Sequence, residues 1–174
     1  AEKGYEIDGA LIDEMVLNPK TDNVSTERIE SELTRIIRSE HPDWGGYLLM
    51  RTGVYPSLIR RLLPETDFNS EVLMESFERL KGLPADTALR LTALTLWMSD
   101  EELIEFLGGL RYPNRIRQDV LSYRRWIDTT ERDGIIAFKT MLADLEIERF
   151  LNLTRLQERI GEERRDEDLV SSAR

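Results

Sequence analysis

The stretch Val24-Ser-Thr-Glu-Arg-Ile-Glu-Ser-Glu-Leu-Thr-Arg-Ile-Ile37 decides the fold class of this 174-residue chain. Its apolar residues recur every three to four positions, which is the spacing of one face of an α-helix, and charged residues surround that face. Ser25 is a favourable N-cap, and Val24 and Ile29 have the spacing of a hydrophobic staple. The stretch therefore predicts an amphipathic helix that opens at Val24-Ser25.

Helical patterns of the same kind continue in both directions from this stretch. No segment alternates between apolar and polar residues as a half-buried strand does, and N-caps, prolines and glycines separate segments of helical length. The sequence therefore predicts an all-α protein, an array of about nine or ten short helices. Besides the quoted stretch, the expected helices begin at or span Asp8, Pro42, Pro56, Asn69 or Ser70, Asp86–Met98, Glu101–Leu110, Pro113-Asn114, Asp133–Leu145 and Ile147–Ile160.

The clearest break in the chain is Gly82-Leu83-Pro84, which divides the predicted helices into residues 1–82 and residues 83–160. The segment Asp86–Met98 is apolar on nearly every side, so it must be surrounded by protein, and we expect Trp97 to be buried against the helix that carries Leu103 and Leu107. Residues 161–174 are dense in charge and lack an apolar stripe. This last segment is therefore predicted to fray.

Composition excludes several classes of function. The chain has no cysteine, which excludes disulfides, thiolate metal sites and cysteine nucleophiles, and its one histidine, His41, cannot stand in for the several imidazoles of zinc hydrolases. Neither a glycine-rich phosphate loop nor a stretch of about 20 apolar residues is present. The sequence predicts a protein of the cytoplasm or of an organelle matrix. The start at Ala1 is expected of a processed chain or of a piece of a longer one.

One segment departs from the acidic balance of the chain. The formal net charge is −10, yet residues 111–127 hold five arginines and one aspartate. Arginine matches phosphate with a planar fork of donors and keeps its charge, so this segment is the candidate RNA-binding surface. The alternative is a solvated helix face that pairs with acidic neighbours. The candidate residues are Arg111, Arg115, Arg117, Arg124 and Arg125.

Several stretches, taken in order, resemble those of class II tRNA nucleotidyltransferases, the CCA-adding enzymes, and of bacterial poly(A) polymerases. The quoted stretch 24–37 is similar to the "S-x-E-R-I-x-x-E-L-x-x-I-L" segment in the neck of those enzymes. The others are Gly4-Tyr-Glu-Ile-Asp8, Tyr47-Leu-Leu-Met-Arg-Thr-Gly-Val54, Leu89-Arg-Leu-Thr-Ala-Leu94 and Phe106-Leu-Gly-Gly-Leu-Arg-Tyr-Pro-Asn114. Pro113 stands where the family has a serine.

The resemblance implies an elongated, all-helical neck, body and tail that hold tRNA-like RNA. In this family a separate head domain adds nucleotides to the RNA 3′ end, with Mg²⁺ and CTP or ATP. The chain lacks the head's Gly-Ser turn and carboxylate pair, so we expect no cofactor, no catalytic residue and no nucleotidyl transfer from these residues alone. Residues 1–82 would be neck-like and 83–160 body- and tail-like. Glu27 and Arg28 would tie neck helices together.

Two functions therefore stay open at the level of sequence. One is an RNA-positioning portion of a nucleotidyltransferase or poly(A) polymerase, whose partners are an RNA 3′ end and a catalytic head. The other is a helical protein-interaction scaffold with no role in RNA binding. The arginines of residues 111–127 distinguish the two, because only the first reading needs them to contact phosphates.

Overall fold

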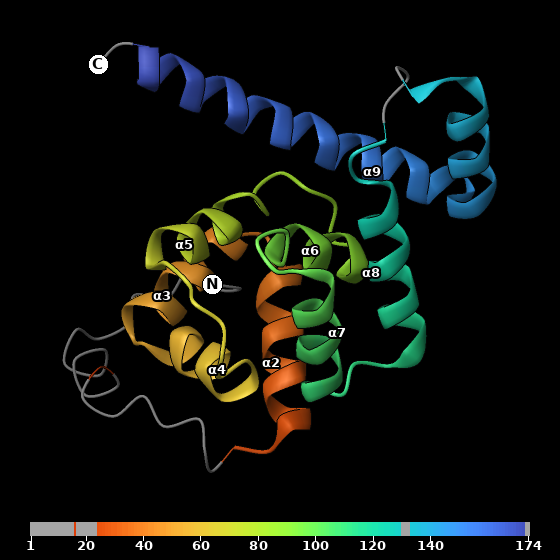
Figure 1. Cartoon of the computed structure of the whole chain (residues 1–174). Coiled ribbons are helices and arrows are strands. Elements are labelled where there is room, and N and C mark those ends of the chain that lie inside the picture. Colours follow the sequence, from red (N-terminus) through yellow and green to blue (C-terminus); the bar gives the residue numbers. More distant parts are fainter. Residues whose placement is uncertain (1–15, 17–23, 130–132, 173–174) are drawn as a thin grey trace.

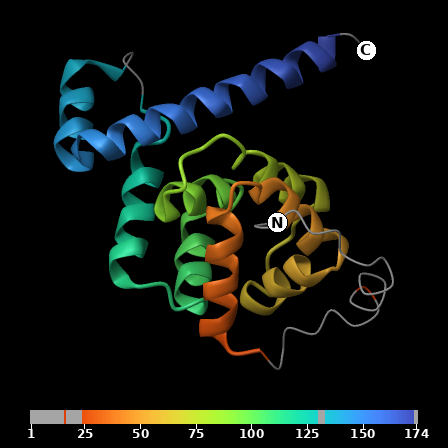
Figure 2. The same ribbon diagram turned by 180° about the vertical axis from the view of Figure 1, so that it is seen from behind.

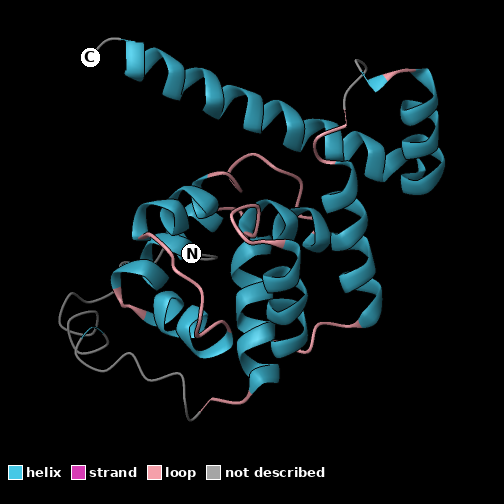
Figure 3. Ribbon diagram, in the orientation of Figure 1, coloured by secondary structure: helices cyan, strands magenta, loops and turns pink. Residues whose placement is uncertain are grey.

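The computed structural model describes residue 16, residues 24–129 and residues 133–172, with side chains as far as Arg165. This part of the chain contains eight α-helices and no strand, which confirms the all-α prediction (Figure 3). The helix predicted from Asp8 lies outside the described residues. The helices are α2 (Thr26–Arg38), α3 (Pro42–Arg51), α4 (Val54–Leu62), α5 (Ser70–Glu78), α6 (Thr87–Leu94), α7 (Asp100–Gly109), α8 (Asn114–Trp126) and α9 (Ile135–Ser172).

Short polar side chains cap the start of four of these helices, α2, α5, α6 and α7. The Ser25 hydroxyl accepts the Arg28 N–H at 3.3 Å, and the Asp86 carboxylate accepts the Leu89 N–H at 2.7 Å. Ser99 and Glu102 form a complete capping box at the start of α7. Each contact satisfies an amide that has no partner inside its own helix, and this fixes where the helix begins.

Helices α2–α8 pack into a body around one buried core, which is shown from two sides in Figures 1 and 2. Gly46 of α3 lies against Phe77 of α5, so closely that a Cβ on Gly46 would stand 2.1 Å from Phe77 Cγ. Residues on both sides of the predicted break at Gly82 share the core. Its largest fully buried side chains include Tyr55, Tyr123, Phe77, Phe106, Ile37 and Ile59.

The apolar segment that starts at Asp86 forms a shorter helix than predicted. Residues 88–94 of α6 are all buried, as expected of a helix that is apolar on nearly every side, but α6 ends at Leu94 and not at Met98. Trp97 therefore lies in the loop that follows. It is half-buried, not buried as predicted, and its ring lies 6.5 Å from that of Phe68.

A buried arginine joins the two halves of the body. Arg90 of α6 is 5% exposed and has no carboxylate partner among the described residues. Its guanidinium donates instead to the Pro84 and Leu83 carbonyls at 2.8 and 2.5 Å, and to the Ile37 and Ser39 carbonyls at 2.5 and 2.8 Å. The last two carbonyls belong to the C-terminal end of α2, where backbone carbonyls have no N–H partner within the helix. The Arg90 cation therefore donates to these carbonyls and also balances the negative end of the helix dipole.

Helix α9 bends once and then leaves the body. Glu146 has φ 58° and ψ 163°, so α9 comprises two helical parts that meet at the residue between the predicted segments Asp133–Leu145 and Ile147–Ile160. We call residues 147–172 the arm, which crosses above the body in both Figures 1 and 2. In the described part of the chain, no helix is long and apolar enough to cross a membrane.

The segment 161–174, which is expected to fray, is helical as far as Ser172, and residues 173–174 lie outside the described residues. Arg159 contacts Glu162 and Glu163 at 3.6 and 3.7 Å, one turn further along, and Glu163 also accepts Arg79 Nε of the body at 2.8 Å. Charged pairs at this spacing support a helix that has no apolar stripe, and the contact with Arg79 fixes the arm to the body.

Candidate functional site

Helix α8 carries four of the five candidate arginines, and they lie on either side of its buried face. Val120 and Tyr123 bury its inner face. On one flank Arg124 turns toward the loop between α6 and α7, and on the other the Trp126 indole N–H donates to Asp144 of α9 at 2.6 Å. The arginines therefore meet different neighbours, and their partners decide which of them is available to a ligand.

Three candidate arginines are engaged within the protein. Arg111, whose φ is 56°, pairs with Glu27 of α2, and Arg125 lies 3.8 Å from Asp144. Arg124 donates to the Leu96 and Met98 carbonyls at 3.1 and 2.6 Å and to Asp100 at 3.1 Å. This guanidinium therefore connects α8 to the start of α7. If it moved to a ligand, the two carbonyls and the carboxylate would lose their hydrogen-bond donor.

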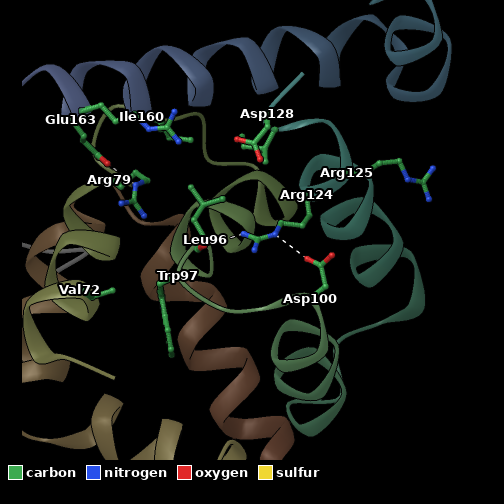
Figure 4. Close-up of a pocket in the computed structure, with 12 residues that line it drawn as sticks. Val72, Arg79, Leu96, Trp97, Asp100, Arg124, Arg125, Asp128, Ile160 and Glu163 are labelled. Atoms are coloured by element: carbon green, nitrogen blue, oxygen red, sulfur yellow. Dashed lines mark hydrogen bonds and ion pairs between the residues drawn. The ribbon is translucent and has the colours of Figure 1, made fainter. Parts of the chain in front are cut away.

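Figure 4 shows the cleft that Arg124 helps to line, between the arm and the body. This arm-side cleft has a volume of about 630 Å³, and four arginines and three carboxylates line it. Arg79 is held by Glu163 and by the Ala93 carbonyl at 3.1 Å, Arg124 points to Asp100, and Arg125 points away. Three of its four arginines are thus engaged, with Arg164 the remaining one.

Arg115 and Arg117 differ from the other candidates. Neither makes an ion pair or side-chain hydrogen bond with the described residues. Arg115 is exposed and lines a second cleft, of about 420 Å³, together with Arg38 at the end of α2. We call it the kink cleft, because Glu146, the residue at the bend of α9, lines it too.

The kink cleft has a polar floor. Arg149 and Asp119 form an ion pair at 2.8 Å, and both side chains are largely shielded from solvent. The hydroxyl of Tyr123 is buried near the Asn152 side chain and makes no hydrogen bond of good geometry with the described residues. Burial first, and then the nearby carboxylate of Asp86, raises the pKa of Tyr123 to about 12, so the phenol is neutral at physiological pH. Asp86 and Asp119 also line the cleft, which places the hydroxyl at its floor.

Sequence reasoning selected Arg115 but missed Arg38 and Tyr123. Arg38 belongs to a different helix, 77 positions earlier, and nothing in the charge pattern links the two. Tyr123 lies on the apolar face of α8, and that position alone indicates a core residue, which its burial agrees with. The available signal was its hydroxyl group. A buried hydroxyl normally has a hydrogen-bond partner, so a tyrosine on the buried face of an arginine-rich helix indicates a polar neighbour or a ligand.

The two residues expected to tie neck helices together lie on the exposed side of α2. The Glu27 carboxylate pairs with Arg111, and its own backbone amide and Arg111 together hold the pKa of Glu27 below its usual value. Thr34 adds a second link from α2 to the same loop, since its hydroxyl lies 3.2 Å from that of Tyr112. Arg28 is exposed and lines a groove of about 260 Å³ between α2, α3 and α4.

Comparison with known families identifies one region. Residues 13–68, about a third of the chain, match a family model described as a probable RNA and SrmB-binding site of polymerase A. No curated protein and no solved structure was found to match the chain. The matched region spans helices α2, α3 and α4, and it includes Arg38 of the kink cleft. Within the described residues, no group of three or more side chains could hold a metal ion.

Proposed function

We propose that this chain is the RNA-binding and RNA-positioning portion of a poly(A) polymerase-like nucleotidyltransferase. The observation that carries the proposal is the match of residues 13–68 to a probable RNA-binding site of polymerase A. The kink cleft supports it, because there the matched region contributes Arg38 beside Arg115 of α8. Arg38 directly follows the resembling stretch 24–37 and Arg115 directly follows 106–114, so the ends of two resembling stretches meet at one surface.

In this proposal the chemistry belongs to a catalytic head domain that is not among these residues. Nucleotidyl transfer needs closely spaced carboxylates that hold two Mg²⁺ ions, and the described side chains offer no such set. The chain would hold the RNA so that its 3′ end reaches the head, where Mg²⁺ and CTP or ATP would bind. We therefore expect these 174 residues alone to bind RNA and to transfer no nucleotide.

Charge limits how tightly the chain binds RNA. At a formal net charge of −10 most of its surface repels phosphate, so binding depends on local arginines and is sensitive to salt. Contact with two or three phosphates predicts a slope of roughly −2 to −3 when log affinity is plotted against log salt concentration. A much steeper slope would require a broad basic surface, which an acidic chain does not offer.

Titration of fluorescently labelled tRNA into the chain, from about 50 to 200 mM salt, tests the proposal. We expect Arg115→Glu with Arg117→Glu to weaken binding strongly, because both arginines lack internal partners. Arg125→Glu is the matched control: it makes the same charge change on the same helix, at a residue that faces Asp144. Absence of tRNA binding by the unaltered chain at low salt would overturn the proposed function.

A protein-binding role is the second candidate, and one observation favours it. The matched family model names a protein, SrmB, beside RNA, and the matched region contains an apolar groove of about 260 Å³. Ile29, Ile36 and Leu49 are among its lining residues and are partly exposed. If this groove binds SrmB, Ile36→Asp should abolish binding of the purified protein while tRNA affinity stays unchanged.

A further inference from the structure

The kink cleft combines charges of both signs around one enclosed volume. Its seven charged lining residues come from three helices and the loop before α6, and they comprise three arginines and four carboxylates: Arg38, Arg115, Arg149, Asp86, Asp119, Glu146 and Glu148. A cleft of about 420 Å³ has room for a single nucleotide-sized ligand. The partners of each charge indicate which kind of ligand fits.

Two cations at the cleft are available. Arg38 and Arg115 make no ion pair with the described residues, whereas Arg149 is neutralised by Asp119 at 2.8 Å. Two guanidinium groups that face one opening are well suited to a phosphate group, because each presents planar donors to the phosphate oxygens.

The carboxylates argue against a bare anion as the ligand. Asp119 is paired and Asp86 caps α6, but Glu146 and Glu148 remain exposed at the rim. Inorganic phosphate would be repelled by these two groups. A ribonucleotide carries its negative charge at one end, and its ribose hydroxyls and base amino groups are donors that carboxylates accept. The mixed lining therefore matches a ribonucleotide better than a simple anion.

The hydroxyl of Tyr123 is a second and independent indication of a ligand. Tyr123 is 1% exposed, and its hydroxyl, which lies near the Asn152 side chain, makes no hydrogen bond of good geometry in the described part of the chain. A buried hydroxyl without a well-formed hydrogen bond costs free energy, and a ligand that moves the Asn152 side chain aside would supply one. Asn152, also buried, lines the same wall with a side chain that can donate and accept.

We infer that the kink cleft binds a single ribonucleotide unit, with its phosphate between Arg38 and Arg115 and its ribose and base toward Asn152 and the Tyr123 hydroxyl. As a unit of an RNA strand this deepens the proposed function, on which it then rests. A free ribonucleotide would satisfy the same groups. The 2′-hydroxyl is the donor that a DNA strand lacks, so the cleft should prefer RNA.

The test compares single-stranded 12-nucleotide RNA and DNA of one sequence, the four ribonucleoside monophosphates, and inorganic phosphate. Each is titrated into the whole chain and into three variants. Tyr123→Phe removes one hydroxyl and keeps the ring, and Arg115→Gln removes one cation. Arg125→Gln is the matched control, because Arg125 lies on the same helix, faces Asp144 at 3.8 Å and does not line the cleft.

We expect Tyr123→Phe and Arg115→Gln each to weaken binding of the RNA by about fivefold or more, and Arg125→Gln to change it by less than about twofold. Tyr123→Phe should leave thermal stability unchanged or slightly raised, because it removes a buried group without a well-formed hydrogen bond. That result separates a ligand contact from a structural role. The RNA should bind more tightly than the DNA of the same sequence.

The outcomes divide this inference from the proposed function. If the RNA binds and Tyr123→Phe and Arg115→Gln bind it as the unaltered chain does, the RNA-binding function stands and the cleft assignment is wrong. If a monophosphate binds the chain and both Tyr123→Phe and Arg115→Gln weaken its binding, but the RNA does not bind, the cleft assignment stands and the proposed function is wrong. Equal binding of RNA and DNA, or competition by inorganic phosphate at the same concentration as a monophosphate, overturns the ribonucleotide assignment.

Discussion

The body and the arm of this protein are stabilised by different means. In the body, seven helices, four of them with a side-chain N-cap, enclose one core, and α3 and α5 approach so closely that Gly46 has no room for a methyl group. In α9, by contrast, apolar side chains remain in solvent, among them Ile136 and Ile147, which are 80% and 75% exposed. The start of the arm packs on the body through Leu153 and Leu156, which are buried in the same core. Beyond them, pairs of charges support the arm. Packing therefore fixes the body and the start of the arm, and charge supports the rest of the arm.

The two clefts show what this difference means for function. The arm-side cleft has more arginines, yet most of them bind carbonyls or carboxylates of the protein itself. The kink cleft has fewer, and two of them are available. A count of charges therefore does not identify a binding surface. What identifies it is the set of cations that the fold leaves without partners.

The largest effect is expected where the body is most tightly packed. Gly46→Ala would place a Cβ 2.1 Å from Phe77 Cγ, so either the ring or helix α3 has to move. We expect a loss of about 3 kcal/mol in the free energy of unfolding, measured by urea denaturation. The matched control is Gly161→Ala in the arm, where a Cβ meets nothing within 4 Å. It should stabilise by up to about 1 kcal/mol, because alanine favours a helix.

If Gly46→Ala destabilises through the ring, a smaller side chain at position 77 should restore part of the loss. Phe77→Leu combined with Gly46→Ala should then be less unstable than the sum of the two single variants predicts. Equal stability of Gly46→Ala and the unaltered chain would contradict the close packing that distinguishes the body from the arm.

Arg90→Met tests whether a buried cation holds the two halves of the body together. The variant keeps much of the side-chain volume but leaves the Ile37, Ser39 and Leu83 carbonyls without this donor. We expect a loss of about 3 kcal/mol in the free energy of unfolding, since buried acceptors without donors are costly. Hydrogen exchange should report faster opening at the end of α2. A variant as stable as the unaltered chain would show that water replaces the guanidinium without cost.

Arg124→Ala tests the boundary between body and arm. Arg124 holds the loop between α6 and α7 through two carbonyls, so we expect a loss of about 2 kcal/mol in stability. At a temperature where the variant is folded, tRNA affinity should change by less than about twofold, because the guanidinium is engaged internally. Unchanged stability with a large loss of tRNA affinity would place Arg124 in the binding surface, as the sequence alone predicts.

Local chemistry made the helix starts predictable. Ser25, Asp86 and Ser99 cap helices at the predicted positions, because a cap depends on residues within one turn. The bend near Glu146 could also be located, since the apolar patterns on its two sides do not continue into each other. Its positive φ could not be predicted, because no glycine marks it. The end of α6 at Leu94 was missed, since the apolar pattern runs past it.

The candidate site was harder to predict than the fold. The density of arginine located α8, but it did not separate Arg115 from Arg124, because the partners of Arg124 come from residues 96–100 and are set by tertiary packing. Arg38 was missed for the same reason, as it reaches the cleft from α2. Sequence therefore predicts where cations are concentrated, and the fold decides which of them remain available.

The smallest expected effect is at the bend of α9, where body and arm meet. Glu146 has φ 58° and ψ 163°, a conformation that costs a residue with a side chain about 1–3 kcal/mol and costs glycine little. Glu146→Gly relieves this strain in the folded protein, but it also raises the conformational entropy of the unfolded chain. The net stabilisation should therefore be about 1 kcal/mol.

Glu148→Gly is the matched control, because the same substitution two residues further on falls in helical backbone. It should destabilise by about 1 kcal/mol, so that thermal denaturation shifts the two melting temperatures in opposite directions. Both variants remove a carboxylate from the rim of the kink cleft, and this common change cancels when they are compared with each other. If Glu146→Gly melts below the unaltered chain, as Glu148→Gly should, the bend carries no strain, and the arm is set in place by its contacts with the body alone.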